Sequence, residues 1–235
     1  MKRYPCRHPA GPITIDGRLD ELAWQVCARA DDFHAYPDFS SGTVATGPLQ
    51  PRFRTQAMAL WDARFLYIGM AGVDDCVWAT ETRYDVPLWH EEVMEIFIDP
   101  GGEGHPYVEL QINPQNAVRD VLVENIYLPR QQWDWQRWGA WQLKGLEHAV
   151  HIFRDELLGG DLGWSVELAI PWEGLRDAAG HAALPPRPGD RWRINFYRYD
   201  RPEGRPAELS AWCYTESDTF HVPSKFGVLE FLDEM

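Results

Sequence analysis

The chain has 235 residues, with 22 Lys and Arg against 36 Asp and Glu, which leaves a formal net charge of −14. This charge argues against nucleic acid and anionic membrane surfaces as partners, since both need a basic face. No apolar run approaches the roughly 20 residues that a membrane-spanning helix requires. The 45% apolar composition is typical of a globular protein with a sizeable core, and without a linker-like stretch we expect residues 1–235 to form one domain.

Apolar residues come in short runs separated by turn signals, which is typical of a protein built from strands. A short helical turn is predicted at residues 20–24, with Asp20 as its cap. Strands are then predicted, in chain order, at residues 53–61, 65–73, 92–98, 107–113, 118–123, 163–170, 191–197 and 226–231. The first two strands form a predicted hairpin, and a second short helix is predicted at residues 172–179. This pattern predicts an all-β protein, an antiparallel, jelly-roll-like β-sandwich of two packed sheets with one or two short helices.

Three of these strands alternate between a polar or mixed face and an apolar face, because side chains project with period two. The mixed faces consist of Val93, Glu95 and Phe97; Glu109, Gln111 and Asn113; and Arg193, Asn195, Tyr197 and Tyr199. The opposite faces are apolar and are predicted to belong to the core: Met94, Ile96 and Ile98; Leu110 and Ile112; Trp192, Ile194 and Phe196. If the three strands are neighbours, the mixed residues form one sheet face, which is either a binding surface or a plain solvent-facing surface.

The cysteines and the N-terminus indicate the cellular compartment in which the chain is expected. Four cysteines, at positions 6, 27, 76 and 213, show no CxxC spacing, which favours free thiols in a reducing cytosol. No apolar stretch follows Lys2 and Arg3, so the chain as written carries no export signal and is expected in the cytoplasm. A leader that has been removed would leave secretion open.

Several short motifs occur in a characteristic order along nearly the whole chain. They are IDGRLDELAW at residues 15–24, LWD at 60–62, FLY at 65–67, LW at 88–89, VMEIFID at 93–99, WSVE at 164–167, GD at 189–190 with INF at 194–196, and PSKFG at 223–227. In this order they resemble the family 9 carbohydrate-binding modules. The resemblance implies a β-sandwich that binds a mono- or oligosaccharide without catalysis and serves polysaccharide catabolism. It also leaves a secreted location open.

The resemblance further implies a site in which a sugar stacks between aromatic rings while polar side chains of a sheet face bond its hydroxyls. Trp89 is similar to the first aromatic of that family, and Phe220 stands where the second is expected. The positions that would bond the hydroxyls are Glu95, Gln111, Asn113 and Tyr197. Arg198 and Trp212 are expected at the rim of the site.

Two other functions remain open from the residues themselves. A glycosidase needs two carboxyl groups about 5 to 9.5 Å apart, and an acidic group surrounds one predicted strand: Glu91, Glu92, Glu95, Asp99 and Glu109. A hydrolase acting on O-glycosyl compounds is therefore the alternative to a binding module. The third interpretation is an interaction domain that has kept the fold and lost the sugar site.

The remaining predictions concern ions and one aromatic segment. No cofactor is expected to be required, although structural calcium is compatible with loop carboxylates at Asp74, Asp75, Asp99 and Glu103. No residue is assigned as a metal ligand. The tryptophans of residues 133–141 are interpreted either as a loop that folds its rings onto the sandwich or as an additional wall for an extended saccharide.

Overall fold

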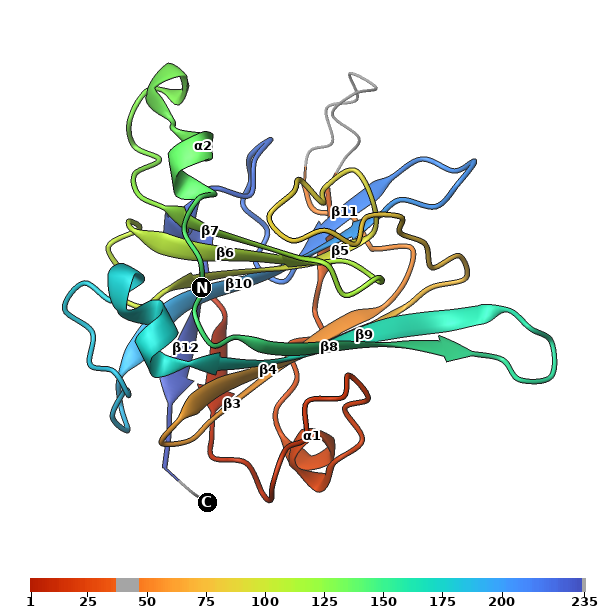
Figure 1. Ribbon diagram of the computed structural model, residues 1–235, viewed down its shortest axis with the longest axis horizontal. Coiled ribbons are helices and arrows are strands. Elements are labelled where there is room, and N and C mark those ends of the chain that lie inside the picture. The colour runs from red at the N-terminus through yellow and green to blue at the C-terminus, as the bar shows by residue number, and fades with distance from the viewer. Residues whose placement is uncertain (37–46, 234–235) are drawn as a thin grey trace.

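A computed structural model describes residues 1–36 and 47–233 of the chain. The strands form two sheets that pack face to face, which confirms the predicted β-sandwich (Figure 1). Strand boundaries match the predictions closely, because alternation and turn residues are local signals that the chain carries in each segment. Among the described residues, no helix combines the length and the apolar character that crossing a membrane requires.

Within the described residues, the larger sheet has eight strands. Its main path runs in the order β1 (Arg3–Cys6), β12 (Gly227–Phe231), β10 (Arg191–Asp200), β5 (Val93–Asp99), β6 (Tyr107–Ile112) and β7 (Val118–Val123). The C-terminal half of β10 also pairs with β11 (Glu208–Ala211). β11 in turn pairs with β2 (His34–Ala35). The sheet is not wholly antiparallel, since β1 pairs with β12 in the parallel direction. The sequence analysis did not predict β1, β2 or β11, which are too short to show a clear alternation.

The smaller sheet has four strands in the order β3 (Thr55–Trp61), β4 (Phe65–Val73), β9 (Asp161–Pro171) and β8 (Glu147–Arg154). The predicted hairpin of β3 and β4 is confirmed, and Asp62 closes its turn by accepting hydrogen bonds from the backbone N–H groups of Arg64 and Phe65 at 2.7 and 2.8 Å. β8 was not predicted because it lies at the sheet edge, where both of its faces are partly exposed and alternation is weak.

The helical segments are short. α1 (Leu22–Val26) lies outside the smaller sheet, and α2 (Trp135–Trp138) lies outside the larger one (Figure 1). The prediction that Asp20 caps the first helix is wrong, since the N-cap is Glu21 and its side chain accepts instead from the backbone N–H of Thr14 at 3.0 Å. The second predicted helix is a 3-10 helix, η3 (Trp172–Ala178). Within the described residues, further 3-10 turns are η2 (Arg130–Gln132) and η4 (Pro223–Lys225).

Two of the motifs that stand far apart in the sequence meet in the structure. Glu167 of β9 accepts hydrogen bonds from the Trp24 indole at 2.7 Å and from the Gly17 backbone at 3.0 Å. Gly17 has a φ of +85°, and a Cβ there would lie 2.6 Å from the Val150 backbone carbon, so the position requires glycine. These motif residues therefore pin the N-terminal segment to the smaller sheet and lie outside any binding site described below.

The core lies between the two sheets. It contains all the apolar residues that alternation assigned to it, including Ile96, Leu110 and Ile194, packed against Met70 and Trp164 of the smaller sheet. All four cysteines are free thiols, as predicted.

The three strands with mixed faces are neighbours, which brings their outward side chains into cross-strand rows. One row runs across the larger sheet as Tyr197, Glu95, Gln111 and Arg119. The neighbouring row runs as Asn195, Phe97, Glu109 and Val121. This face is not a plain solvent surface, because a second apolar cluster that includes Trp138 and Phe220 covers much of it.

Candidate functional site

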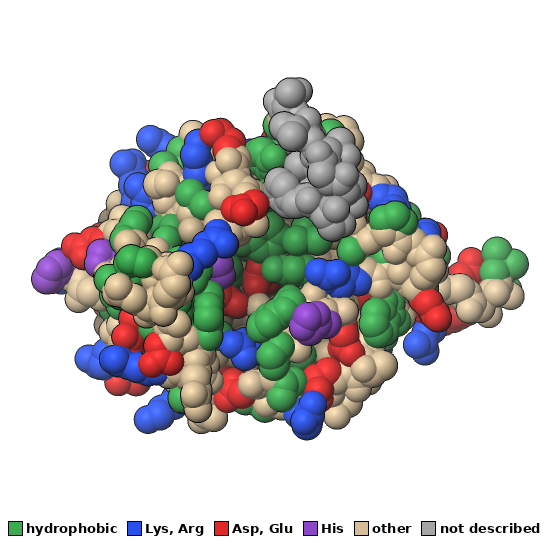
Figure 2. Space-filling view, turned by 90° about the horizontal axis from the view of Figure 1, so that it is seen from above, with side chains coloured by type: hydrophobic (Ala, Val, Ile, Leu, Met, Phe, Trp, Pro, Cys, Tyr) green, Lys and Arg blue, Asp and Glu red, His purple; other side chains and the backbone are tan. Residues whose placement is uncertain are grey.

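A pocket of about 460 Å³ opens on the outer face of the larger sheet. Its floor is formed by four side chains of β5 and β6: Glu95, Phe97, Glu109 and Gln111. Its walls come from loops and neighbouring strands and include Trp89, Arg119, Trp135, Tyr199, Phe220 and His221. Figure 2 looks onto this face and shows a central hollow with acidic side chains at its bottom and hydrophobic side chains around it.

The floor is built around one amide group held between two carboxyl groups. The Nε2 of Gln111 donates to Glu95 Oε1 at 2.8 Å and to Glu109 Oε1 at 2.7 Å. Both glutamates are almost fully buried, with 1% and 4% of their surface exposed. The other oxygens of this group, Glu95 Oε2, Glu109 Oε2 and Gln111 Oε1, have no hydrogen-bond partner among the described residues. Because these three side chains line the pocket, a ligand that enters it can supply the missing hydrogen bonds.

Burial controls the protonation of the floor. It raises the pKa of Glu95 well above the usual range, and the nearby charge of Glu109 raises it further. Burial also raises the pKa of Glu109, while the positive charge of Arg119 opposes this shift. Burial lowers the pKa of His221 to about 4, so its imidazole is neutral at pH 7, and its Nδ1 bonds the hydroxyl of Tyr107 at 2.5 Å.

The aromatic rings that line the pocket include those of Trp89, Phe220 and Trp135. Trp89 lies in the loop before β5, half-buried, with the Arg119 guanidinium 5.3 Å from its ring centroid. Phe220 is stacked on Tyr197, with ring centroids 4.1 Å apart and an angle of 15° between the planes. Trp135 of α2 is 37% exposed and its ring centroid lies 5.1 Å from that of His221. Aromatic faces beside buried acceptors suit a ligand with both apolar faces and hydroxyl groups.

Of the eight residues assigned to the site from sequence, the pocket brings together Trp89, Glu95, Gln111 and Phe220. The described residues that line it do not include the other four: Asn113, Tyr197, Arg198 and Trp212.

Each of these four side chains is occupied elsewhere. Asn113 donates to the Glu81 carbonyl at 2.8 Å and to Glu91 at 3.1 Å, which holds the loop that precedes β5. Tyr197 supports Phe220 from below and donates to its carbonyl oxygen at 3.0 Å. Trp212 packs in the core between the sheets.

Arg198 points to the opposite face of β10 from Tyr197, as period-two alternation requires. It is 2% exposed and lies between the two sheets. Its guanidinium donates to Asp74 at 2.6 Å and to the Val73 carbonyl at 2.8 Å, and it reaches Thr55 at 3.3 Å. Arg198 therefore ties the larger sheet to β3 and to the end of β4.

The pocket residues that were not assigned to the site from sequence include Glu109, Arg119, Trp135, Tyr199 and His221. Glu109 and Tyr199 share the face of Gln111 and Tyr197 by alternation, so that signal was present. Arg119 lies directly opposite Gln111 because β7 pairs with β6 in this register. The sequence does not give this pairing. Of the tryptophan segment, Trp135 lines the pocket, whereas Trp138 is buried against the sheet, as the interpretation of a loop folded onto the sandwich predicts.

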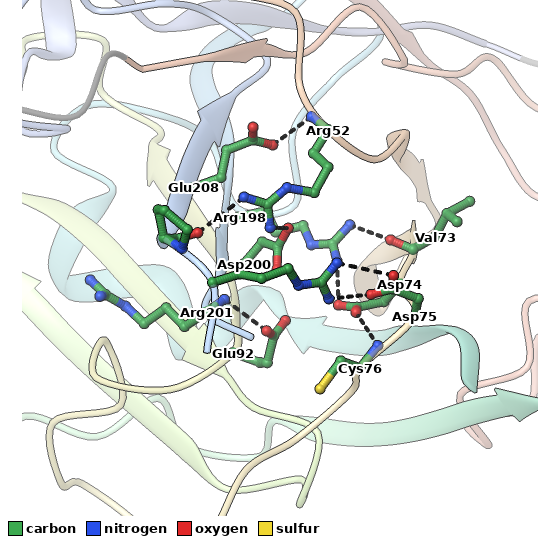
Figure 3. Close-up of polar contacts among 12 residues, drawn as sticks. Arg52, Val73, Asp74, Asp75, Cys76, Glu92, Arg198, Asp200, Arg201 and Glu208 are labelled. Carbon is green, nitrogen blue, oxygen red and sulfur yellow. Dashed lines mark hydrogen bonds and ion pairs between the residues drawn. The ribbon is translucent and has the colours of Figure 1, made fainter. Parts of the chain in front are cut away.

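A second acidic group surrounds Arg198 (Figure 3). Asp74, Glu92 and Asp200 are buried, and one carboxylate oxygen from each lies within 4.8 Å of the others. Burial and the charge of Asp74 raise the pKa of Glu92 to about 9, so its carboxyl group is protonated at pH 7. Asp200 lies near two cations. It is close to Arg198, and it forms an ion pair with Arg52, whose guanidinium lies 3.5 Å from its Oδ2.

These residues do not fit a calcium ion, which takes six to eight oxygen ligands. Asp74 uses Oδ2 for Arg198 and Oδ1 for the backbone N–H of Cys76, and one Glu92 oxygen accepts from the Arg201 backbone at 2.7 Å. The unpartnered oxygens are Glu92 Oε2 and Asp200 Oδ1, which are too few. Two of the other loop acids are engaged as well: Asp99 closes a turn through Gly102 and Gly104, and Asp75 pairs with Arg205.

The fold and the pocket define a β-sandwich with a small-molecule site on one sheet face. The chain belongs to the carbohydrate family 9 binding domain-like family, whose model matches residues 15–234. None of the curated proteins compared with the chain matches it.

Solved structures share the whole fold at low identity. A family 9 carbohydrate-binding module from Caldicellulosiruptor kristjanssonii in complex with cellotriose has a TM-score of 0.62 at 14% identity, covering 100% of this chain and 95% of that chain. The module from the same organism in complex with glucose has a TM-score of 0.60 at 15% identity, covering 100% and 97%. A proposed carbohydrate-binding protein from Bacteroides uniformis has a TM-score of 0.64 at 16% identity, covering 98% and 99%.

Proposed function

We propose that this chain is a non-catalytic carbohydrate-binding domain that holds a mono- or oligosaccharide in the pocket on its larger sheet. The observation that carries the proposal is the combination of three unpartnered buried oxygens at the floor with the aromatic rings of Trp89, Trp135 and Phe220 at the walls. A sugar ring presents an apolar face to an aromatic ring and hydroxyl donors to buried acceptors. Family membership and the glucose and cellotriose of the similar structures support sugars built from glucose units.

The positions of the acids favour binding over hydrolysis. A glycosidase places its two carboxyl groups on either side of the scissile bond. Here Glu95 and Glu109 both bond the same nitrogen of Gln111, which holds them together on one side of the pocket. A sugar above this floor meets both acids from the same direction, so they serve as acceptors for its hydroxyls.

The test is a calorimetric titration of the full chain with glucose and cellotriose. We expect saturable binding to the wild-type chain and at least a tenfold loss with Trp89→Ala, because that ring is a wall of the pocket. Trp141→Ala is the matched control, since the Trp141 indole bonds Asp177 at 2.8 Å outside the pocket. Affinity unchanged by Trp89→Ala would refute the site. If the chain binds neither glucose nor cellotriose, the interpretation as an interaction domain that has lost the sugar site is favoured.

A further inference from the structure

The floor of the pocket carries an excess of acidic groups that the surrounding cations do not balance. Glu95 and Glu109 lie side by side, each with one oxygen on Gln111 and one unpartnered. The cation beside them is Arg119, whose guanidinium lies over the Trp89 ring and whose Nε has no hydrogen-bond partner among the described residues. No ion pair between Arg119 and either glutamate is present in the part of the chain that the structure describes.

The other charged groups at the pocket leave this excess in place. Asp218 at the rim pairs with Arg130 at 3.6 Å, and both are well exposed to solvent. His221 lies 3.9 Å from Glu109 Oε2 and is uncharged at pH 7. Two buried carboxyl groups therefore face one arginine, and the arginine is directed to an aromatic ring.

The arrangement of the floor is the one that a protonated amine requires. A single nitrogen, Gln111 Nε2, already lies between the two carboxyl groups and donates one hydrogen to each. The remaining oxygens of Glu95 and Glu109, with the amide oxygen of Gln111, form a second set of buried acceptors in side chains that line the pocket. An ammonium group supplies three donors and no acceptor, and its charged hydrogen bonds are about twice as strong as neutral ones. A hydroxyl supplies one donor and no charge.

We infer that this pocket selects a sugar that carries a positively charged amino group, and that the amino group is bound at the unpartnered oxygens of Glu95, Glu109 and Gln111. The inference rests on the proposed function, since it names the class of sugar for the same site. The neutral part of the sugar packs against the aromatic walls, as in the proposed function.

The experiment compares four sugars of one ring type by calorimetry at a pH of about 7, where the raised pKa of Glu109, about 7, leaves part of its carboxyl group ionised and an amine is still mostly protonated. Glucosamine carries the charge, N-acetylglucosamine keeps the nitrogen without it, glucose has neither, and glucuronate carries the opposite charge. We expect glucosamine to bind about tenfold more tightly than glucose and N-acetylglucosamine, because one charged hydrogen bond replaces a neutral one. The Glu109→Gln variant is expected to abolish this preference.

Glu92→Gln is the matched control, because it makes the same chemical change in the buried group around Arg198, outside the pocket. It should leave the preference for glucosamine unchanged. Equal binding of glucose and glucosamine to the wild-type chain overturns the inference and leaves the proposed function standing. Tighter binding of glucuronate also overturns it, since Arg119 would then govern the pocket. Binding by none of the four sugars overturns the inference and the proposed function together.

Discussion

The pocket floor and the group around Arg198 place acidic side chains from one stretch of chain in two different environments. Glu92 directly precedes β5 and Glu95 lies three positions further on within it, so the two project to opposite faces of the larger sheet. Glu92 lies between the sheets beside Asp74, whose carboxylate is bonded to Arg198. Glu95 faces a pocket of about 460 Å³ that a ligand can enter.

The difference shows how the same residue type serves stability in one place and recognition in the other. A buried carboxylate is costly unless it is paired or protonated. Between the sheets the chain's own groups offset this cost: Arg198 and Arg52 pair with the aspartates, and Glu92 is protonated. At the pocket it leaves acceptor oxygens without partners, so a ligand that brings donors recovers the cost on binding.

The largest effect is expected from Arg198→Met, which removes the cation from the group between the sheets. The free energy of unfolding should fall by about 3–5 kcal/mol, because buried charges lose their partner. Urea unfolding measures this loss. Arg119→Met at the pocket is the comparison, and its cost should be lower by at least about 2 kcal/mol, since the pocket acids border open space. Equal losses in the free energy of unfolding for the two variants would contradict the proposed difference between the two acidic groups.

The next effect concerns pH. The folded pKa of Glu92 is about 9, far above that of a glutamate in the unfolded chain. The folded protein therefore holds this proton more tightly, so stability is greatest below the unfolded pKa and falls as pH rises toward 9, by up to about 1.4 kcal/mol per pH unit. Glu92→Gln should reduce the slope between about pH 6 and 9 in unfolding curves, and the raised pKa of Glu95 should leave a remaining slope. A slope unchanged by the substitution would contradict the assignment.

A smaller effect is expected at the wall formed by α2. Trp135→Ala should weaken sugar binding by about 0.5–1.5 kcal/mol, the range for one aromatic contact. Stability should change little because the ring is 37% exposed. The exposed neighbour Gln136→Ala provides the control on the same helix. Calorimetry that finds equal affinity for the two variants would remove α2 from the site.

The smallest effect is expected from chelation. Because Arg198 already occupies the group between the sheets, EDTA should shift the melting temperature by less than about 1 °C. Differential scanning calorimetry with and without added Ca²⁺ tests this. A large fall in the melting temperature on chelation would show that a metal ion, rather than the arginine, balances these acids.

Most of the strands and their two faces follow from local patterns in the sequence. Alternation placed Ile96 and Leu110 in the core and put Glu95 and Gln111 on the opposite face, because side-chain direction along a strand is a local property. The same parity shows that Arg198 shares the face of Phe196, a signal that the assignment of Arg198 to the rim did not use.

The tertiary structure alone decided which strands are neighbours and which loops close the pocket. The row from Glu95 through Gln111 to Arg119 exists because β5, β6 and β7 pair in that register. Trp135 and His221 reach this row from connections that pack across the sheet from distant parts of the chain. Such packing depends on contacts between remote segments, which no local pattern of residues encodes.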